Sequence, residues 1–283
     1  MHKRRLSIAI PASVVSDTPH LREKTSKIGL IGRAAAIFRV DEIIVYPDNP
    51  KMQKADMDLI ATLLAYMDTP QYLRKRVFEL KPTLRYAGIL PPLRAPHHPL
   101  KRKIKDLKDG EFREGVTVSN KAEGTLVDIG VEKPALIPNK QITVGRRVTV
   151  RITAFENSVE AQLADREEIA GYWGYRVTVE NSSFGKIVVD RNFDLTIATS
   201  KYGVPFVDFA DEIAQEFEKA ESVLVAFGAP SLGLYEIVRS EGLNLDDVVD
   251  FVVNTIPTQG TETVRTEEAL VASLAILNVY LRF

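Results

Sequence analysis

The last hundred residues contain three apolar runs of strand length, and each run passes directly into a polar loop rich in glycine, proline, serine or threonine. The three stretches are LTIATSKYG, SVLVAFGAPSLG and VVDFVVNTIPTQGTETVRTEEAL. In open parallel sheets, ligands bind where loops leave the carboxyl ends of buried strands. The pattern therefore predicts an α/β fold in which these loops form a site.

The amino-terminal segment predicts the same class of fold. LSIAIPASVV has the character of a buried strand, TSKIGLIGRAAAIFRV of a helix, and DEIIVYPDNP of a second strand closed by a turn. Strand, helix and strand in that order form the unit of a parallel sheet. ADMDLIATLLAYM and PQYLRKRVFEL follow, and their apolar spacing predicts two further helices.

A proline-rich and basic stretch, LPPLRAPHHPLKRKIKDLKDG, ends this regular pattern. From Phe112 to about Ala170 the sequence consists of short alternating segments with turn signals, which favours a small β-barrel. Beyond Trp173 an α/β pattern returns, with YRVTVE and GKIVVD predicted as strands and FVDFADEIAQEFEKA as an amphipathic helix. We therefore predict one discontinuous α/β domain, residues 1–95 and 172–283, interrupted by a barrel of residues 96–171.

The net charge of −1 conceals an asymmetry along the chain. Residues 1–171 hold 29 Lys and Arg against 21 Asp and Glu, whereas residues 172–283 hold 8 against 17. The basic part is suited to a polyanion, although the charges also fit ordinary solvated faces. Because small five-stranded barrels often bind oligonucleotides, the basic run beside the predicted barrel is either an RNA-binding segment or a solvated linker. Its candidate phosphate contacts are Lys101, Arg102, Lys103 and Lys105.

Several classes of protein are disfavoured. The chain has no cysteine, which excludes disulfides, thiolate nucleophiles and cysteine-bound metals. Its basic start lacks the uninterrupted apolar segment of a signal peptide, and no apolar run approaches the ~18 residues of a membrane span, so we expect a cytoplasmic protein without a membrane contact. His97 and His98 lie in the proline-rich stretch without partners at metal-binding spacing, and we interpret them as surface histidines and expect no metal.

Familiar nucleotide motifs are also absent. Gly228 and Gly233 have P-loop spacing, but Leu234 and Tyr235 stand where that motif needs lysine and serine or threonine. No GxGxxG follows the first predicted strand, and there is no HExxH.

Some residues of the loops have structural explanations. Gly228 permits a close approach of the backbone, and Pro230 stiffens it. Thr266 is a candidate helix N-cap followed by two glutamates in the first turn. Arg33 lies among small and apolar residues of a predicted helix, where a charge must either reach solvent or meet an anion.

AFGAPSLGL and NTIPTQGTETVRTEEAL, together with RLSIAIPASVV and REKTSKIGLIGRAAAIFRVDEIIVY, resemble the SPOUT superfamily of S-adenosylmethionine-dependent RNA methyltransferases. Within it, the chain is similar to the archaeal and eukaryotic rRNA uridine methyltransferases that carry an OB-like barrel inserted in the catalytic domain. The resemblance covers nearly the whole chain. It implies a carboxyl-terminal trefoil knot formed by the three loops, and a homodimer with active sites at the subunit interface.

The resemblance also implies that S-adenosyl-L-methionine binds in these loops. Ile256, Val264 and Thr266 match positions that hold adenine and ribose, while Gly228 and Pro230 form a second wall and Thr199 a third. The full set of implied cofactor-binding residues is Thr199, Ser200, Gly228, Ala229, Pro230, Asn254, Ile256, Pro257, Thr261, Val264 and Thr266.

KIGLIGRAAAIFRVDEII resembles the first motif of SPOUT ribose methyltransferases, in which an asparagine precedes an arginine by six residues. Here the arginine matches Arg33, but Lys27 occupies the asparagine position. This difference favours a base rather than a ribose as the methyl acceptor. We expect Arg33 to stabilise negative charge on a uridine ring nitrogen, and Arg265 to orient the base or a phosphate.

Two other functions remain open from the sequence. One is a non-catalytic RNA-binding or ribosome-assembly factor that keeps the α/β domain as a scaffold. The other is a methyltransferase that acts on tRNA or protein, because a fold does not determine a substrate.

Overall fold

The computed structural model describes residues 4–49, 53–154 and 158–282. The chain forms two compact units, and the division falls within helix α2 (Lys54–Asp68). The first unit consists of Met1–Ala65, Thr83–Pro92 and Tyr175–Phe283, and the second of Tyr66–Pro82 and Leu93–Gly174.

The first unit is built on a six-stranded sheet in which every pairing is parallel. The strand order is β11-β9-β10-β1-β2-β8. The strands are β1 (Arg5–Pro11), β2 (Glu42–Tyr46), β8 (Arg176–Val179), β9 (Leu195–Pro205), β10 (Ser222–Ala226) and β11 (Phe251–Asn254). The predicted α/β class with a parallel sheet is confirmed.

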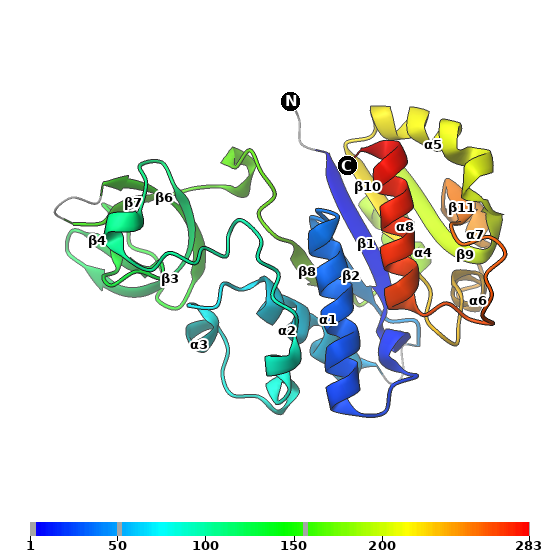
Figure 1. The fold of residues 1–283 in the computed structure, drawn as a ribbon, viewed down its shortest axis with the longest axis horizontal. Helices are drawn as coiled ribbons and strands as arrows, with labels where there is room; N and C mark the ends of the chain where they lie inside the picture. The colour runs from blue at the N-terminus through cyan, green and yellow to red at the C-terminus, as the bar shows by residue number, and fades with distance from the viewer. Residues whose placement is uncertain (1–3, 50–52, 155–157, 283) are drawn as a thin grey trace. The chain divides into compact units, whose positions relative to one another are not determined.

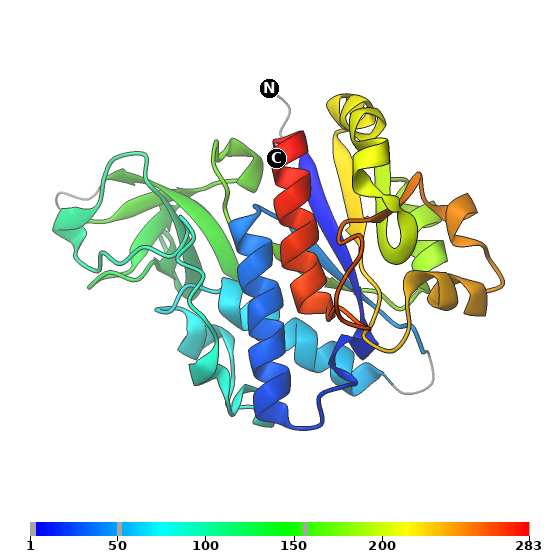
Figure 2. The same ribbon diagram turned by 45° about the vertical axis from the view of Figure 1, so that its right-hand side comes forward.

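Helices cover both faces of this sheet (Figures 1 and 2). On one face, α1 (Leu21–Ile37) and α8 (Thr266–Leu281) lie side by side, and α5 (Phe206–Lys219) contacts α8. On the other face, α4 (Phe184–Arg191), α6 (Leu234–Ser240) and α7 (Leu245–Val248) share a core with strand residues such as Ala9, Ile44 and Leu224. Because both faces are covered, the central strands read as continuous apolar runs.

Strand β9 is interrupted where it runs beside β11. Val252 pairs with Ala198, whereas the next residue, Val253, pairs with Val204, so Thr199–Gly203 have no opposite residue in β11. Gly203 is required in this break, because a Cβ there would lie 2.7 Å from the Val253 carbonyl carbon and 2.8 Å from the Val252 oxygen. The register shift therefore makes Thr199–Gly203 a bulge within a strand that continues to Pro205.

The second unit contains the predicted barrel, which is closed and has the strand order β3-β4-β5-β7-β6. Its strands are β3 (Phe112–Lys121), β4 (Gly124–Asp128), β5 (Ala135–Pro138), β6 (Arg147–Ala154) and β7 (Glu160–Leu163). The only parallel pairing is that of β5 with β7, and β6 closes the barrel against β3. A five-stranded closed barrel of this kind agrees with the OB-like insertion. The short helices α3 (Arg74–Val77) and η2 (Pro82–Leu84) precede it in the chain.

Two element predictions were wrong. GKIVVD was predicted as a strand, but it lies in helix α4, where Phe184, Ile187 and Val188 are buried at helical spacing. The β-branched residues of this segment favour a strand, but its packing on the sheet stabilises a helix. PQYLRKRVFEL was predicted as a helix, but only Arg74–Val77 is helical, and none of those residues is buried. A turn without a buried face gains little from packing and does not extend.

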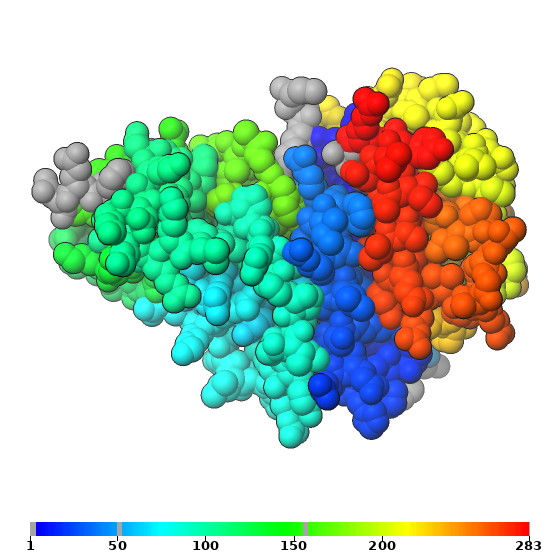
Figure 3. All heavy atoms as spheres, in the orientation of Figure 1, coloured from blue at the N-terminus to red at the C-terminus, as the bar shows by residue number. Residues whose placement is uncertain are grey.

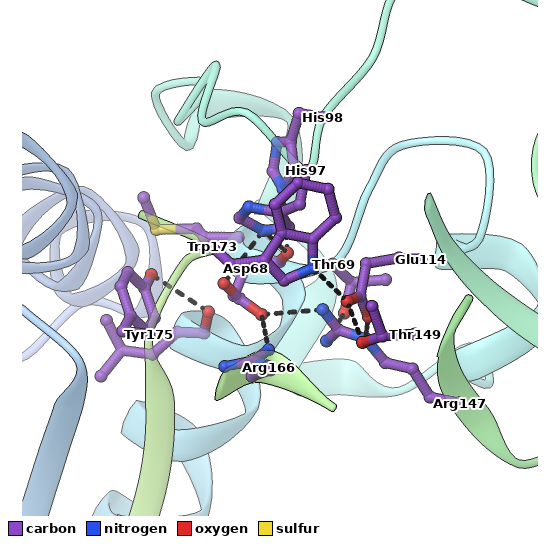
Figure 4. Close-up of polar contacts among 12 residues, drawn as sticks. Asp68, Thr69, His97, His98, Glu114, Arg147, Thr149, Arg166, Trp173 and Tyr175 are labelled. Atoms are coloured by element: carbon purple, nitrogen blue, oxygen red, sulfur yellow. Dashed lines mark hydrogen bonds and ion pairs between the residues drawn. The ribbon is translucent and has the colours of Figure 1, made fainter. Parts of the chain in front are cut away.

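The interpretation of His97 and His98 as surface histidines was also wrong. His97 is fully buried in the second unit, and its Nε2 donates a hydrogen bond of 2.8 Å to the Asp68 backbone oxygen (Figure 4). The same nitrogen lies 3.1 Å from Asp68 Oδ1. Burial raises the pKa of the Asp68 carboxyl, but His97, Arg147 and Arg166 together lower it below its ordinary value. Burial also lowers the pKa of His98 to about 4.

Glu114 extends this polar network into the barrel (Figure 4). Its carboxylate accepts hydrogen bonds of 2.7 Å from Arg147 Nε, 2.7 Å from Trp173 Nε1 and 2.8 Å from the Thr149 hydroxyl. Burial raises the pKa of Glu114, but the Arg147 charge and these donors lower it below its ordinary value. Arg147 also donates to Asp68, so one guanidinium joins two buried carboxylates and ties the end of α2 to the barrel.

Candidate active site

A cavity of about 330 Å³ lies beside the middle of β9 and the carboxyl ends of β10 and β11. Its walls are the interrupted part of β9, the loop after β10 and the loop between β11 and α8. The last of these loops (orange) lies at the molecular surface next to α8 (red) in the space-filling view (Figure 3). The volume is within the range of small-molecule pockets, and the position is that expected of a ligand site in a parallel sheet.

Most of the residues that the resemblance assigned to the cofactor line this cavity. They are Thr199, Ser200, Gly228, Ala229, Pro230, Asn254, Ile256, Val264 and Thr266. Pro257 and Thr261 belong to the same loop, but they are not part of the cavity wall. The structure thus brings together residues from three segments that are far apart in the sequence.

Threonine side chains fasten the three loops to one another. Thr199 Oγ1 donates to the Ala226 backbone oxygen at 2.9 Å, and Thr266 Oγ1 donates to the Gly228 oxygen at 2.9 Å. Part of the threonine content of the loops is therefore structural.

The start of α8 differs by one residue from the prediction. Thr266 is the first helical residue rather than the N-cap, which is Arg265. The Arg265 backbone N–H donates to Glu268 Oε2 at 3.0 Å, so Glu268 satisfies one of the free donors at this helix end. Glu267 and Glu268 do lie in the first turn, as predicted.

Neither predicted catalytic arginine lines the cavity of its own chain. Arg33 lies on α1, and its Nη1 donates to the Pro92 backbone oxygen at 3.1 Å. Arg265 is exposed at the start of α8. Their predicted roles are not tested by this geometry.

Lys27, which occupies the asparagine position of the first motif, is buried on α1. Its Nζ lies 2.6 Å from Asp17 Oδ1 and 3.4 Å from Glu267 Oε2. Burial raises the pKa of Asp17, but hydrogen bonds from Lys27 and Thr18 and the Lys27 charge lower it below its ordinary value. One buried ammonium thus links the segment after β1 to the first turn of α8, beside the cavity wall.

The four predicted RNA-binding residues, Lys101, Arg102, Lys103 and Lys105, are all exposed in the barrel unit. The segment that holds them is anchored, because Leu107 is buried in the barrel core and Ile104 packs against it. The Lys101 backbone oxygen accepts a hydrogen bond of 3.2 Å from the buried Arg113. The basic run is therefore held on the barrel with its charges in solvent.

Sequence reasoning missed two charged residues of the cavity, Lys201 and Glu236. They are the only charged side chains among the described residues that line it. Lys201 belongs to the interrupted part of β9. Glu236 follows the glycine loop by three residues, on the side of α6 opposite the buried Leu234, Ile237 and Val238. The helical spacing of these buried residues was the sequence signal from which the position of Glu236 could have been predicted.

The described part of the chain contains no group of three or more His, Asp or Glu side chains that is arranged to hold a metal ion. None of the described helices is both long and apolar enough to cross a membrane.

Two kinds of comparison relate the chain to known proteins. A family model described as "Putative RNA methyltransferase" matches residues 5–277. An uncharacterized protein of Halobacterium salinarum is 33% identical, over 96% of this chain and 98% of its own length. The 28S rRNA (uridine-N(3))-methyltransferases of Mus musculus and Homo sapiens are 33% and 32% identical over 96% of this chain, which corresponds to 75% and 77% of theirs. The chain belongs to this family of RNA methyltransferases, whose reaction requires a methyl donor.

Proposed function

We propose that the protein transfers a methyl group from S-adenosyl-L-methionine to N3 of a uridine in ribosomal RNA. The observation that carries the proposal is the cavity formed jointly by the bulged part of β9, the loop after β10 and the loop between β11 and α8. The mouse and human relatives that match almost the whole chain are named for this uridine N3 reaction.

The cavity has the features that the donor requires. Ile256, Val264 and Leu232 offer apolar contacts for an adenine ring, and the backbone of Gly228 is approachable because it carries no side chain. We extend the proposal to a SPOUT trefoil knot made by the same three loops. The hydrogen bonds that tie Thr266 to Gly228 and Thr199 to Ala226 support such an interlocked arrangement.

When bound, the donor supplies an electrophilic methyl group. The protein must then hold the uridine ring so that N3 faces that methyl, and it must stabilise the negative charge that develops as N3 loses its proton. Arg33 is the residue we assign to this stabilisation, because a guanidinium remains protonated at all relevant pH values. Arg265, exposed at the start of α8, is assigned to orienting the base or a neighbouring phosphate.

Since Arg33 lies outside the cavity of its own chain, we propose that it acts in a homodimer, on the donor bound to the partner subunit. Apolar side chains exposed on α1 and α8 support a second copy as the partner. They are Leu30 and Ile37 on α1, and Val271, Val279 and Tyr280 on α8.

We further propose that the OB-like barrel of residues 96–171 grips the RNA, with Lys101, Arg102, Lys103 and Lys105 on phosphates, while residues 1–95 and 172–283 carry out the transfer. A target base in structured RNA must be unstacked before it enters such a cavity. Ribosomal RNA as the substrate is consistent with a cytoplasmic location.

Methyl transfer from labelled S-adenosylmethionine to unmodified ribosomal RNA, followed by nucleoside mass spectrometry, tests the proposal. We expect 3-methyluridine. Methylation of tRNA or protein but not rRNA would assign another substrate, and RNA binding without any product would favour the assembly-factor alternative.

Replacing Arg33 by alanine should leave donor affinity unchanged and reduce transfer by at least about a hundredfold, because an electrostatic stabiliser of the transition state is lost. Donor binding is measured by calorimetry and transfer by the labelled assay. Unchanged turnover would refute the assigned role.

Complementation tests whether Arg33 acts across a dimer. A loop variant with impaired donor binding, Gly228→Trp, keeps Arg33, whereas Arg33→Ala keeps the cavity. If each variant alone is inactive, a mixture that forms heterodimers should recover activity in one of its two sites. No recovery in a mixture shown to contain heterodimers would place Arg33 in the same chain as the donor it serves.

A further inference from the structure

Glu236 is positioned by the packing of α6. Leu234, Ile237 and Val238 of this helix are buried in the core between α4, α7 and the sheet. Their spacing fixes the rotation of the helix, and Glu236 is left on the side that borders the cavity. The carboxylate is therefore held by the fold in the wall of the donor cavity.

Gly233 makes room for this carboxylate, and Gly228 packs against Gly233. A Cβ on Gly233 would lie 2.7 Å from Glu236 Oε2, and a Cβ on Gly228 would lie 3.1 Å from the Gly233 Cα. The glycines of the GAPSLG segment thus pack closely on each other, and the second leaves open the space that the carboxylate occupies. This explains the glycine spacing that resembled a P-loop without serving phosphate.

The Glu236 carboxylate makes no hydrogen bond or ion pair with another residue in the described part of the chain. Glu236 lines the cavity, whose only other charged lining residue among those described is Lys201. A carboxylate kept in a ligand cavity without a protein partner is suited to a cationic ligand group, since charge-assisted hydrogen bonds are stronger than neutral ones.

We propose that Glu236 binds the α-ammonium group at the amino-acid end of the methyl donor. The inference rests on the proposed function, because it requires that the donor be S-adenosylmethionine. The amino-acid end of that molecule carries one positive and one negative charge. Glu236 matches the ammonium, and Lys201, the opposite charge in the same cavity, matches the carboxylate.

This assignment separates Glu236 from the catalytic step. The α-ammonium group is present in both the donor and its product, S-adenosylhomocysteine, and it is unchanged by methyl transfer. A contact to it is therefore uniform binding, which affects KM for the donor and leaves kcat unchanged.

Calorimetry with S-adenosylhomocysteine and with its analogue that lacks the α-amino group tests the inference. Glu236→Gln should weaken binding of S-adenosylhomocysteine about 10- to 150-fold, which corresponds to one charge-assisted hydrogen bond. The same substitution should leave binding of the deaminated analogue unchanged within about twofold. Glu262→Gln is the matched control, because Glu262 is exposed on the neighbouring loop and does not line the cavity.

Gly233→Ala is a second variant that keeps Glu236 chemically intact. Gly233 has a φ of −74°, so alanine is allowed there, and its Cβ would meet only the Glu236 carboxylate. Displacement of that flexible side chain should again weaken the binding of S-adenosylhomocysteine more than the binding of the deaminated analogue.

Equal weakening of both ligands by Glu236→Gln, or weakening of neither, would overturn the inference. Unchanged binding with reduced transfer that recovers as pH rises would also overturn it, and would make Glu236 the acceptor of the uridine proton. A wild-type protein that binds neither S-adenosylmethionine nor its product would instead refute the proposed function, and the inference with it.

Discussion

Replacing Lys27 by methionine tests whether the buried ammonium on α1 holds the start of α8. The Lys27 side chain is 5% exposed, and its two carboxylate neighbours, Asp17 and Glu267, are 31% and 9% exposed. Methionine fills nearly the same volume, so little packing is lost. The main effect is that two carboxylates lose their counter-charge, one of them almost fully buried.

The expected loss follows from these exposures. Removing one partner of a buried ion pair costs about 3–5 kcal/mol. Water already reaches Asp17, so we expect a value at the lower end, about 3 kcal/mol. For a protein of this size, about 2–4 °C of Tm is lost per kcal/mol, which gives a decrease of about 6–12 °C at neutral pH.

Urea and thermal unfolding followed by circular dichroism measure this loss. Lys27→Arg, which keeps the charge, should lose less, and Lys27→Met combined with Glu267→Gln should recover part of the stability. The Asp17 pKa is lowered in the folded state, so the stability that it contributes is present above its unfolded pKa of about 4 and is lost as the pH falls. The difference between wild type and Lys27→Met should therefore shrink near pH 3. A loss below about 1 kcal/mol at pH 7, or a difference independent of pH, would refute the reasoning.

Three further perturbations test other parts of the molecule. Gly203→Ala should destabilise the protein by about 1–3 kcal/mol and weaken donor binding, because its Cβ would clash with the β11 backbone. Gly88→Ala is the control, since a Cβ at Gly88 has no atom within 4 Å, and it should have neither effect. Glu114 has a lowered pKa, so its contribution to the free energy of unfolding is present above about pH 4 and is lost on acidification. In urea titrations, Glu114→Gln should therefore be less stable than wild type at pH 7, and its stability should fall less between pH 5 and 2. Replacing the four basic residues of 101–105 by glutamine should lower the slope of log K against log salt for RNA binding by about 3. An unchanged slope would show that this run is a solvated linker that does not contact RNA phosphates.

The sheet could be predicted from the sequence because its central strands β1, β2 and β10 are buried on both faces and are therefore largely apolar. The three carboxyl-terminal runs became β9, β10 and β11. The predicted loops follow β10 and β11, but the loop predicted after LTIATS lies within β9, which continues to Pro205 and leads directly into α5. Alternation and turn signals were likewise sufficient for the barrel. The exception among the predicted strands was Phe184–Arg191, whose β-branched residues favour a strand although its packing on the sheet stabilises a helix.

Buried polar groups were harder to predict, because their partners are distant in sequence. His97 looked exposed among prolines, yet it is enclosed with Asp68, which precedes it by 29 residues. Nothing local to either residue indicates the other. Lys27 likewise pairs with Glu267, which lies near the other end of the sequence.

The donor cavity shows which residues of a site can be read from a sequence. Loops that bind a ligand with backbone atoms need glycine and proline to shape them, and those residue types stand out in GAPSLG and NTIPTQG. A side chain such as Glu236 has no such mark, because a glutamate in a helix is commonly a solvated surface residue. It becomes informative only when Gly233 is seen to leave space for its carboxylate beside the cavity. From the sequence, these glycines indicate flexible backbone. From the structure, Gly233 leaves space for a charged side chain, and the Gly233→Ala variant tests this second interpretation.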